Sequence, residues 1–322
     1  MRKWILTLII FTTIITQAQD TLSLLSPTSL TLPKFTENEQ TPTSSRKWLL
    51  GAGMALTYGG SFIFLNEAWY KGYPRSSFHT FNDGGEWLQM DKIGHSWTAY
   101  HSARLNSALW HWAGLNHQQS VLAGTGISLG YMLSIEYLDG RSAEWGWSWP
   151  DVAADIFGGS LFAAQALTWG EQRISIKFSS FQKHYEAGAM DTRARNLFGK
   201  GAAERLLKDY NAQTYWLSGN IKSLFNVPSL PAWLNIAVGY GADGMLGGYE
   251  NVARDKEGNI SFNRPDIKRF RQWYIAPDID LTRIKTKSRF LRSAFFVLNS
   301  FKFPAPALEL SQGKLQAHWL AF

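Results

Sequence analysis

The stretch DKIGHSWTAYHSARL, residues 91–105, is mostly suited to burial. Within two helical turns it nevertheless contains an acid, a base and a histidine. Positions i and i+4 of a helix share a face, so we expect Asp91 and His95 to lie one above the other. A carboxylate that orients an imidazole is one arrangement of a general base. The spacing therefore predicts a buried polar pair, or a catalytic His95 oriented by Asp91.

Three further acids occur in apolar surroundings. Asp151 and Asp155 are one turn apart and are followed on that face by Gly158 and Gly159, and Glu136 ends an uncharged stretch. Isolated charges on apolar helices are costly, so they must pair, take up protons or bind something. We expect Glu136, Asp151 and Asp155 to converge with His95 as candidate binding residues. Their oxygen atoms could hold a divalent cation, although the sequence indicates no resident cofactor.

Each of these residues also has a purely structural interpretation. Ser148 three residues before Asp151 fits a helix start, with Ser148 as the N-cap. Asp91 is compatible with the first turn of its own helix, and Glu136 with an ion pair to Arg141 in the following turn. The histidine could be an inert, hydrogen-bonded core residue. HExxH and P-loop motifs are absent from the sequence, and its G-x-S-x-G, Gly126-Ile-Ser-Leu-Gly130, lies within the uncharged stretch 120–135. The sequence therefore indicates no established catalytic residue.

Four apolar helices are expected to position these side chains, over residues 48–65, 91–115, 120–135 and 148–169. The first and third are uncharged and approach the length of a membrane span, and their glycines suit close helix contact. The alternative is a buried bundle in a soluble protein. Several of the helices are apolar nearly all round, which favours membrane association.

The second half of the chain differs in composition. Residues 47–170 contain 6 basic and 9 acidic residues, whereas residues 171–322 contain 22 basic and 13 acidic ones. The stretches 233–249 and 271–284 are typical of strands, 203–210 and 289–301 of helices, and the C-terminus of a hairpin. A basic half of this kind suits anionic lipid headgroups. The four or five expected strands are too few for a transmembrane barrel.

The N-terminus predicts export. Arg2 and Lys3 precede a twelve-residue apolar run, and Ala18 ends a site typical of signal peptidase,. We therefore expect a signal peptide at 1–18, a linker at 19–46, an apolar helical domain at 47–170 and a basic aromatic-rich domain at 171–322. None of the 322 residues is cysteine, so we expect neither disulfides nor an acylated cysteine anchor. An exported chain is not expected to bind nucleic acid.

The order of these motifs resembles a known family. DKIGH at 91–95, E-x-x-D-G-R-S at 136–142, a Trp-Gly-Trp-Ser turn and D-x-x-x-D-x-x-G-G at 151–159 resemble the YfiM-like family. That family is a domain of unknown function, described as predicted periplasmic lipoproteins and common in Bacteroidota, and the resemblance covers residues 47–170. More distantly, the pattern is similar to VanZ-like membrane proteins, which usually have Asn at the position of Asp155. The resemblance implies an envelope location and a convergent polar cluster, and it transfers no activity.

We therefore expect a mainly α protein. An apolar four-helix core, membrane-embedded or membrane-associated, precedes a smaller, basic, mixed α/β C-terminal region. The expected function is that of an exported cell-envelope protein on the periplasmic side of the inner or outer membrane. Its Asp/His/Glu cluster organises the core or binds a headgroup or cation, with a membrane lipid or envelope component as partner. The alternative is a metal-assisted hydrolase or transferase that acts on an envelope lipid or its phosphate.

Overall fold

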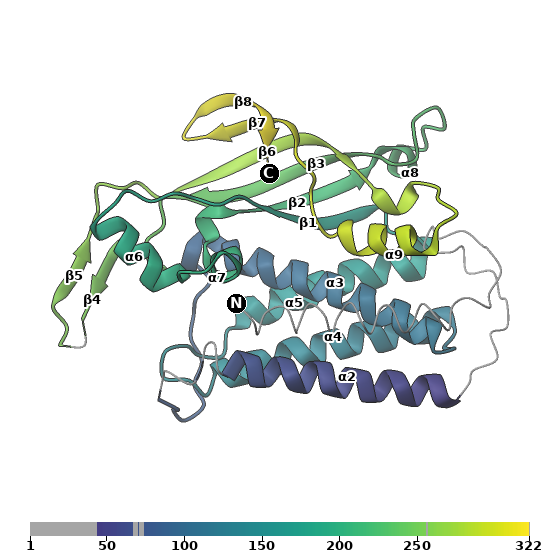
Figure 1. Cartoon of the computed structure of the whole chain (residues 1–322), viewed down its shortest axis with the longest axis horizontal. Coiled ribbons are helices and arrows are strands. Elements are labelled where there is room, and N and C mark those ends of the chain that lie inside the picture. Colours follow the sequence, from purple (N-terminus) through teal and green to yellow (C-terminus); the bar gives the residue numbers. More distant parts are fainter. Residues whose placement is uncertain (1–43, 67–69, 71–73, 256, 322) are drawn as a thin grey trace.

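The protein is built of a helical layer and a curved sheet (Figure 1). This computed structural model describes residues 44–66, 70, 74–255 and 257–321. The expected signal peptide and nearly all of the expected linker lie outside the described residues. The long helices are α2 (Ser44–Leu65), α3 (Met90–Trp112), α4 (His117–Asp139) and α5 (Trp149–Trp169).

Six strands form one antiparallel sheet in the order β1-β2-β3-β6-β7-β8. Their bounds are β1 Ile174–Ser180, β2 Gln213–Asn220, β3 Leu234–Asp243, β6 Phe270–Ile279, β7 Ala305–Ser311 and β8 Lys314–Ala321. A separate hairpin consists of β4 (Val252–Arg254) and β5 (Ile260–Asn263). The short helices are η3 Glu86–Gln89, α6 Ala189–Phe198, α7 Ala202–Lys208, η4 Tyr210–Ala212, α8 Ile221–Phe225, η5 Leu281–Arg283 and α9 Arg289–Leu298.

Local signals set the ends of the helices that carry the polar cluster. Asn116 and Gln119 form a reciprocal capping box at the start of α4,. The side chain of Ser148 accepts a hydrogen bond from the backbone N–H of Asp151, which confirms Ser148 as the N-cap of α5. That helix ends at Gly170, whose φ of 67° lies in the left-handed region,. All four expected helices are therefore present, with shifted ends.

Small residues bring α3, α4 and α5 close together. A Cβ atom on Gly158 of α5 would lie 2.1 Å from the backbone oxygen of Ser96 on α3, and one on Gly124 of α4 would lie 2.3 Å from the backbone nitrogen of Ser107. The Ser96 hydroxyl also donates to the backbone oxygen of Ala154 across the α3–α5 contact, over 2.9 Å. Only glycine permits such an approach of two helix backbones.

The first long helix is more peripheral. Leu50 is the only residue of α2 that is buried, and Figure 1 shows α2 at the edge of the helical layer. Tyr58 accepts a hydrogen bond from Asn106 of α3 over 2.7 Å, and Tyr131 of α4 donates to Ser61 over 2.9 Å. The packed core therefore consists of α3, α4 and α5, and a core of four equally packed helices is not confirmed.

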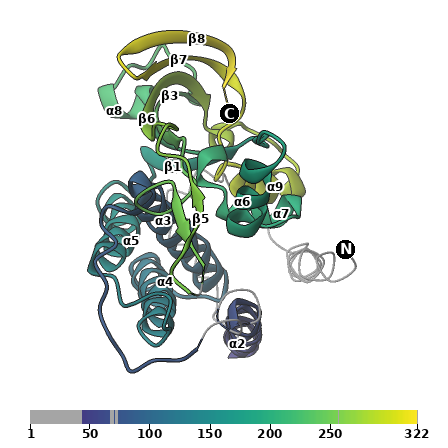
Figure 2. The same cartoon turned by 90° about the vertical axis from the view of Figure 1, so that its left-hand side faces the viewer.

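The two faces of the sheet differ in chemistry. On β1 and β2, the face that carries Ile176, Phe178 and Tyr215 packs against the helical layer. The opposite face buries Lys177 and Asp278, whose charged atoms lie 2.7 Å apart. We call these the apolar face and the polar face. Figure 2 shows the sheet curling from β1, beside α3, to β8 on the far side, so most of the apolar face extends beyond the helices.

Candidate functional site

Three helices each contribute one side chain to a buried cluster. His95 lies in the second turn of α3, Glu136 near the end of α4 and Asp155 in the second turn of α5. Nδ1 of His95 lies 3.1 Å from Oδ1 of Asp155 and 3.9 Å from Oε1 of Glu136. Both carboxylate side chains expose only 1% of their surface, whereas the imidazole exposes 22%. We call these three residues the histidine cluster.

Lys92 forms the centre of a second, adjoining cluster. Its ammonium group lies 2.6 Å from Asp83, 2.7 Å from Asp91 and 2.8 Å from Asp151. The side chain of Lys92 is only 10% exposed, so its charge is compensated by carboxylates and hardly by water. Asp151 links the two clusters, because its Oδ1 also lies 3.8 Å from Nε2 of His95.

Ser148, the residue before α5, joins the two clusters by hydrogen bonds. Oε2 of Glu136 accepts the backbone N–H of Ser148 over 3.2 Å, and the Ser148 hydroxyl donates to Asp83. Ser148 therefore caps α5 and at the same time connects the two clusters. One residue thus sets the start of α5 and the positions of two acids.

The two clusters hold more negative than positive groups. Five carboxyl groups face Lys92 and His95, so three negative charges are left over if every carboxyl group is ionised. Burial raises the pKa of Asp155 and of Asp151, which favours their neutral forms,. Burial acts in the opposite direction on His95, but the hydrogen bond to Asp155 and the charge of Asp151 outweigh it and raise the pKa of His95 to about 10. A bound cation or bound protons must balance the excess.

Two carboxylate oxygens of the histidine cluster have unused bonding capacity. Oε1 of Glu136 and Oδ2 of Asp155 are buried and have no hydrogen-bond partner among the described residues. Buried polar atoms are almost always satisfied, so such orphans point to a missing proton, water or ion. One ligand atom each from His95, Glu136 and Asp155 can be chosen so that all lie within 4.8 Å of one another.

These separations suit a small divalent cation. A tetrahedral ion about 2.0–2.1 Å from nitrogen and oxygen ligands holds those ligands roughly 3.3 Å apart. Two of the relevant atom pairs, both to Nδ1 of His95, are separated by 3.1 and 3.9 Å. If Nδ1 of His95 were a ligand, Nε2 would face the carboxylate of Asp151. A carboxylate in this position orients a metal-binding imidazole.

A strained segment leads into the site. Trp87, Leu88 and Gln89 have φ angles of 47°, 52° and 66°, a single left-handed turn immediately before α3. Each such non-glycine residue costs roughly 1–2 kcal/mol. The strain is offset by contacts with the sheet region, including the bond from Tyr240 to the Leu88 carbonyl and the bond of 2.7 Å from Arg271 to the Gln89 side chain. These contacts hold the start of α3, and hence Lys92 and His95, against the sheet.

The sequence predicted the members of the site better than their pairing. Glu136, Asp151 and Asp155 do converge with His95, but the prediction that Asp91 pairs with His95 was wrong. Asp91 turns to Lys92 instead, while His95 pairs with Asp155 across the helix contact. The roles of these residues in binding or catalysis remain predictions.

Sequence reasoning also missed two partners. It did not single out Asp83, which lies in a turn outside the helices, or Lys92 as the residue that holds three acids. The only available signal was the presence of one lysine inside an apolar segment. The suggested pair of Glu136 with Arg141 is not formed, because Glu136 bonds to the backbone of Ser148.

Comparison with known proteins bears on the helical layer alone. No curated protein and no solved structure matches the chain. The matching family segment contains α3, α4, all but the last two residues of α5 and every residue of the two clusters, so the site lies wholly within it. Residues 80–167 match the model of a family described as predicted periplasmic lipoprotein (DUF2279), whose function is not characterised, and this similarity supports an exported, periplasmic location for the chain.

Proposed function

We propose that this exported envelope protein binds a divalent cation between His95, Glu136 and Asp155. The observation that carries the proposal is that Glu136 and Asp155, two buried carboxylates within 3.9 Å of an imidazole nitrogen, each have an oxygen without a hydrogen-bond partner among the described residues. A cation would satisfy both oxygens and reduce the excess of negative charge. The adjoining Lys92 cluster would then fix Asp151 behind the imidazole.

The ligand set narrows the class of ion. One imidazole nitrogen with two carboxylates suits Zn²⁺, Mn²⁺ or Fe²⁺ better than Ca²⁺, which takes six to eight oxygen ligands. The partly exposed edge of His95 offers a path from the surface to the site. The site would be loaded after export and would stabilise the contact of the three helices.

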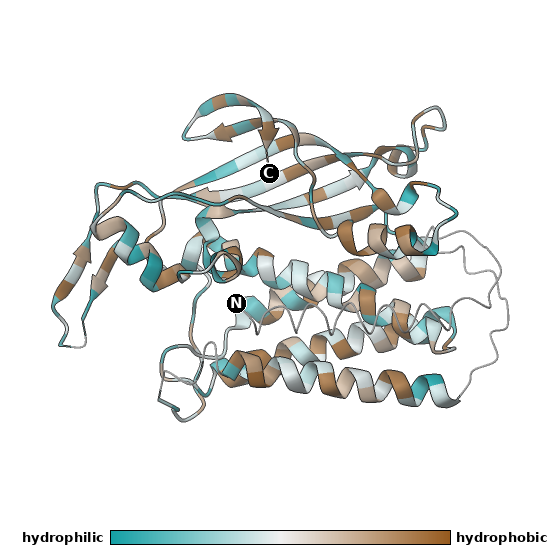
Figure 3. Ribbon diagram, in the orientation of Figure 1, coloured by the Kyte–Doolittle hydropathy of each residue, from teal (hydrophilic) through white to brown (hydrophobic). Residues whose placement is uncertain are grey.

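Membrane association is the second part of the proposal. The helices α2 and α4 are long and apolar enough to cross a membrane, by length and composition. Of these, α2 exposes Trp48, Leu56 and Ile63 at 71–78% of their surface, and Figure 3 shows the apolar character along it. Such a helix at the edge of the layer fits a surface that faces lipid. A membrane lipid is therefore the partner that we propose.

A hydrolase or transferase of envelope lipid phosphate is less well supported. Such an enzyme needs positive groups that are free to hold the phosphate. The ammonium group of Lys92 is already paired with three carboxylates. The local excess of negative charge would repel an anionic substrate. The general base pair of the alternative, His95 with Asp91, is not formed. We therefore do not assign an activity to the cluster.

The proposal predicts cation binding that depends on Asp155. We expect wild-type protein to bind one Mn²⁺ or Zn²⁺ per chain in equilibrium dialysis. Removal of a ligand oxygen in Asp155→Asn should weaken binding at least about 100-fold, more than loss of an outer partner typically does. At an ion concentration about 100 times the Kd, wild-type protein should gain roughly 2.7 kcal/mol of stability.

The matched control is Glu144→Gln, which removes an exposed acid of the same helical region and should change neither affinity nor stability. A wild-type protein that binds no ion, with Asp155→Asn as stable as wild type, would show that the cluster only organises the core. A folded Asp155→Asn variant that still binds one ion with unchanged affinity would exclude this site.

A further inference from the structure

The apolar face of the sheet remains uncovered beyond the helical layer. Leu217, Val238, Ile275 and Leu308 are paired in register across β2, β3, β6 and β7. Each exposes 44–49% of its surface. The banding of brown residues along the strands is visible in Figure 3. A continuous apolar surface of this kind on a protein marks an interaction site.

The buried side of the same strands combines charged and polar groups with small and aromatic side chains such as Ala276 and Trp216. Lys177 and Asp278 are at most 2% exposed, and the Ser218 hydroxyl donates to Asp278 over 2.6 Å. A sheet in water places its apolar side in the core and its polar side in solvent. Here that arrangement is reversed on β3 and β6, which is the pattern of strands that face lipid.

The lengths of the elements agree with that environment. β3 and β6 each contain 10 residues, about 33 Å at 3.3 Å per residue. The exposed helix α2 has 22 residues, about 33 Å at 1.5 Å per residue. Strands and long helices run in similar directions in Figure 1. Both lengths match the hydrocarbon core of a bilayer, about 30 Å.

One end of the sheet carries positive charge. The segment that follows β6, residues 281–292, contains five basic residues and no acidic one. Arg283 is paired with Asp280 and Glu171, whereas Lys285 and Lys287 are exposed. The adjoining helix α9 exposes Phe290, Leu291 and Leu298 on one stripe. Basic residues beside an apolar stripe are typical of a helix at a membrane interface, and anionic headgroups complement this charge.

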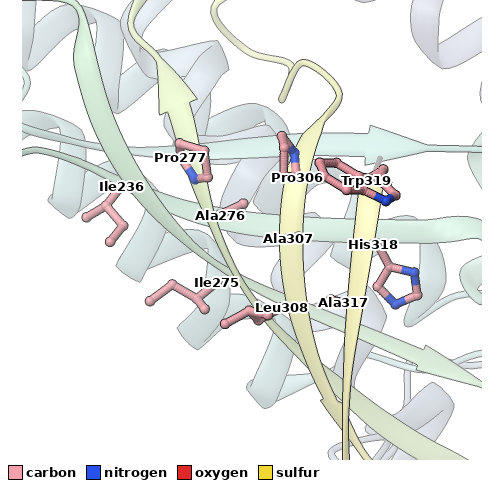
Figure 4. A pocket seen from close by; sticks show the side chains of 10 residues that line it. All are labelled: Ile236, Ile275, Ala276, Pro277, Pro306, Ala307, Leu308, Ala317, His318 and Trp319. Carbon is pink, nitrogen blue, oxygen red and sulfur yellow. The ribbon is translucent and has the colours of Figure 1, made fainter.

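A groove crosses the apolar face where β6 and β7 separate. Their pairing stops at Ile275 and Leu308, and Pro277 and Pro306, which have no backbone N–H, stand just beyond,. The resulting groove has a volume of about 380 Å³ and extends to Trp319 of β8 (Figure 4). Its lining is apolar apart from His318, so it suits a hydrocarbon chain better than a polar ligand.

We propose that the apolar face of β3, β6, β7 and β8 contacts the acyl chains of a phospholipid bilayer, with residues 281–292 at anionic headgroups. This inference rests on the proposed membrane association of α2 and extends it to the C-terminal half. Lipid is favoured over a second copy of the chain because the basic segment at the rim would repel its own copy, whereas it complements anionic lipid.

Single-cysteine labelling tests the inference, since the chain contains no cysteine. A nitrobenzoxadiazole fluorophore is attached to the full chain at Val238→Cys or Leu308→Cys. Leu56→Cys on α2 reports membrane association, and Ile260→Cys on the separate hairpin is the control, because Ile260 is also apolar and 54% exposed. Each protein is mixed with phosphatidylethanolamine–phosphatidylglycerol vesicles whose acyl chains are brominated. We expect severalfold quenching at positions 238, 308 and 56, and none at 260.

Each other outcome overturns the inference in a recognisable way. Quenching at 56 without quenching at 238 and 308 would mean that the helices meet lipid and the sheet does not, which leaves the proposed function intact. No quenching at any position would contradict both the lipid contact of the sheet and the proposed membrane association of α2. Fluorophores at 238 and 308 that become shielded with rising protein concentration, without lipid, would show that a second copy covers the face.

Contact between residues 281–292 and lipid headgroups is tested with a separate variant. Lys285→Gln with Lys287→Gln should weaken binding to phosphatidylglycerol vesicles about 5-fold for each lysine, a loss that disappears in high salt. Because both side chains are exposed, the fold should be unaffected. Equal affinity of the variant and the wild type at low salt would contradict contact between this segment and headgroups.

Discussion

We expect Lys92→Met to lose about 3–5 kcal/mol of folding stability, the range for removing one partner from a buried ion pair. The methionine fills similar volume, so the loss comes from charge. Without the ammonium group, Asp83, Asp91 and Asp151 face one another in a site that is largely closed to water. Urea unfolding followed by tryptophan fluorescence measures the change.

Lys208→Met is the matched control, because Lys208 pairs with Glu204 within α7, where both side chains are partly exposed, at 22% and 41%. It should cost less than Lys92→Met, about 1 kcal/mol, because water screens a partly exposed pair. The Lys92 variant should regain part of its stability on addition of Ca²⁺ or Mg²⁺, since the three acids offer ligand atoms within 4.8 Å of one another. Equal losses in the two lysine variants would show that Lys92 does not hold the acids together.

We expect Gly158→Ala to cost roughly 3 kcal/mol or more, at the upper end of overpacking effects. The new methyl group would overlap the backbone of α3 at Ser96, only 2.1 Å away, and a backbone cannot move aside as a side chain can. Since Ser96 directly follows His95, the forced separation of α3 and α5 should also weaken cation binding. Thermal unfolding and equilibrium dialysis of the same variant test both effects.

Gly126→Ala provides the matched control on α4. A Cβ there meets nothing within 4 Å, so this substitution should be neutral or should stabilise the helix by up to about 1 kcal/mol. If Gly158→Ala were as harmless as Gly126→Ala, the close contact of α3 with α5 would not be needed for the fold. Cation binding that survives the separation of the helices would in turn argue against a site shared between them.

The helical layer was predictable because its signals are local. Long apolar runs and terminal residues such as Ser148 and Gly170 place helix ends to within a few residues. Convergence of the acids was also predictable, since a charge such as Asp155 inside an apolar helix needs a partner. The identity of that partner could not be predicted, because the pairing of Asp155 with His95 depends on how α5 packs against α3. Periodicity along one helix carries no such information.

The C-terminal half was less predictable. The strands β3 and β6 and the final hairpin were expected, but β1 and β2 were not. The sequence of β1, ISIKFSS, places Lys177 within the strand, and the structure buries that lysine against Asp278. In most sheets the apolar residues of a strand are buried and the polar residues are exposed. Here a charged pair is buried and aliphatic residues are exposed, so the alternation along the strand does not predict burial. The boundary between domains at residues 170 and 171 stays a prediction.

The family match supports the coarser part of the expected resemblance. It indicates an uncharacterised periplasmic lipoprotein domain over residues 80–167. The YfiM-like assignment, the source in Bacteroidota and the distant likeness to VanZ-like proteins stay predictions. The matched segment ends before the sheet begins at Ile174, so the proposed lipid contact of the sheet depends on the structure alone.

The most direct test of the cation site is anomalous diffraction from crystals of the full chain grown with Mn²⁺. We expect one strong anomalous peak between Nδ1 of His95 and the carboxylates of Glu136 and Asp155, with Nε2 of His95 facing Asp151. A peak only at other residues would contradict it. The absence of any peak at this cluster, with Nδ1 of His95 still donating its hydrogen bond to Asp155, would also contradict the proposed cation site.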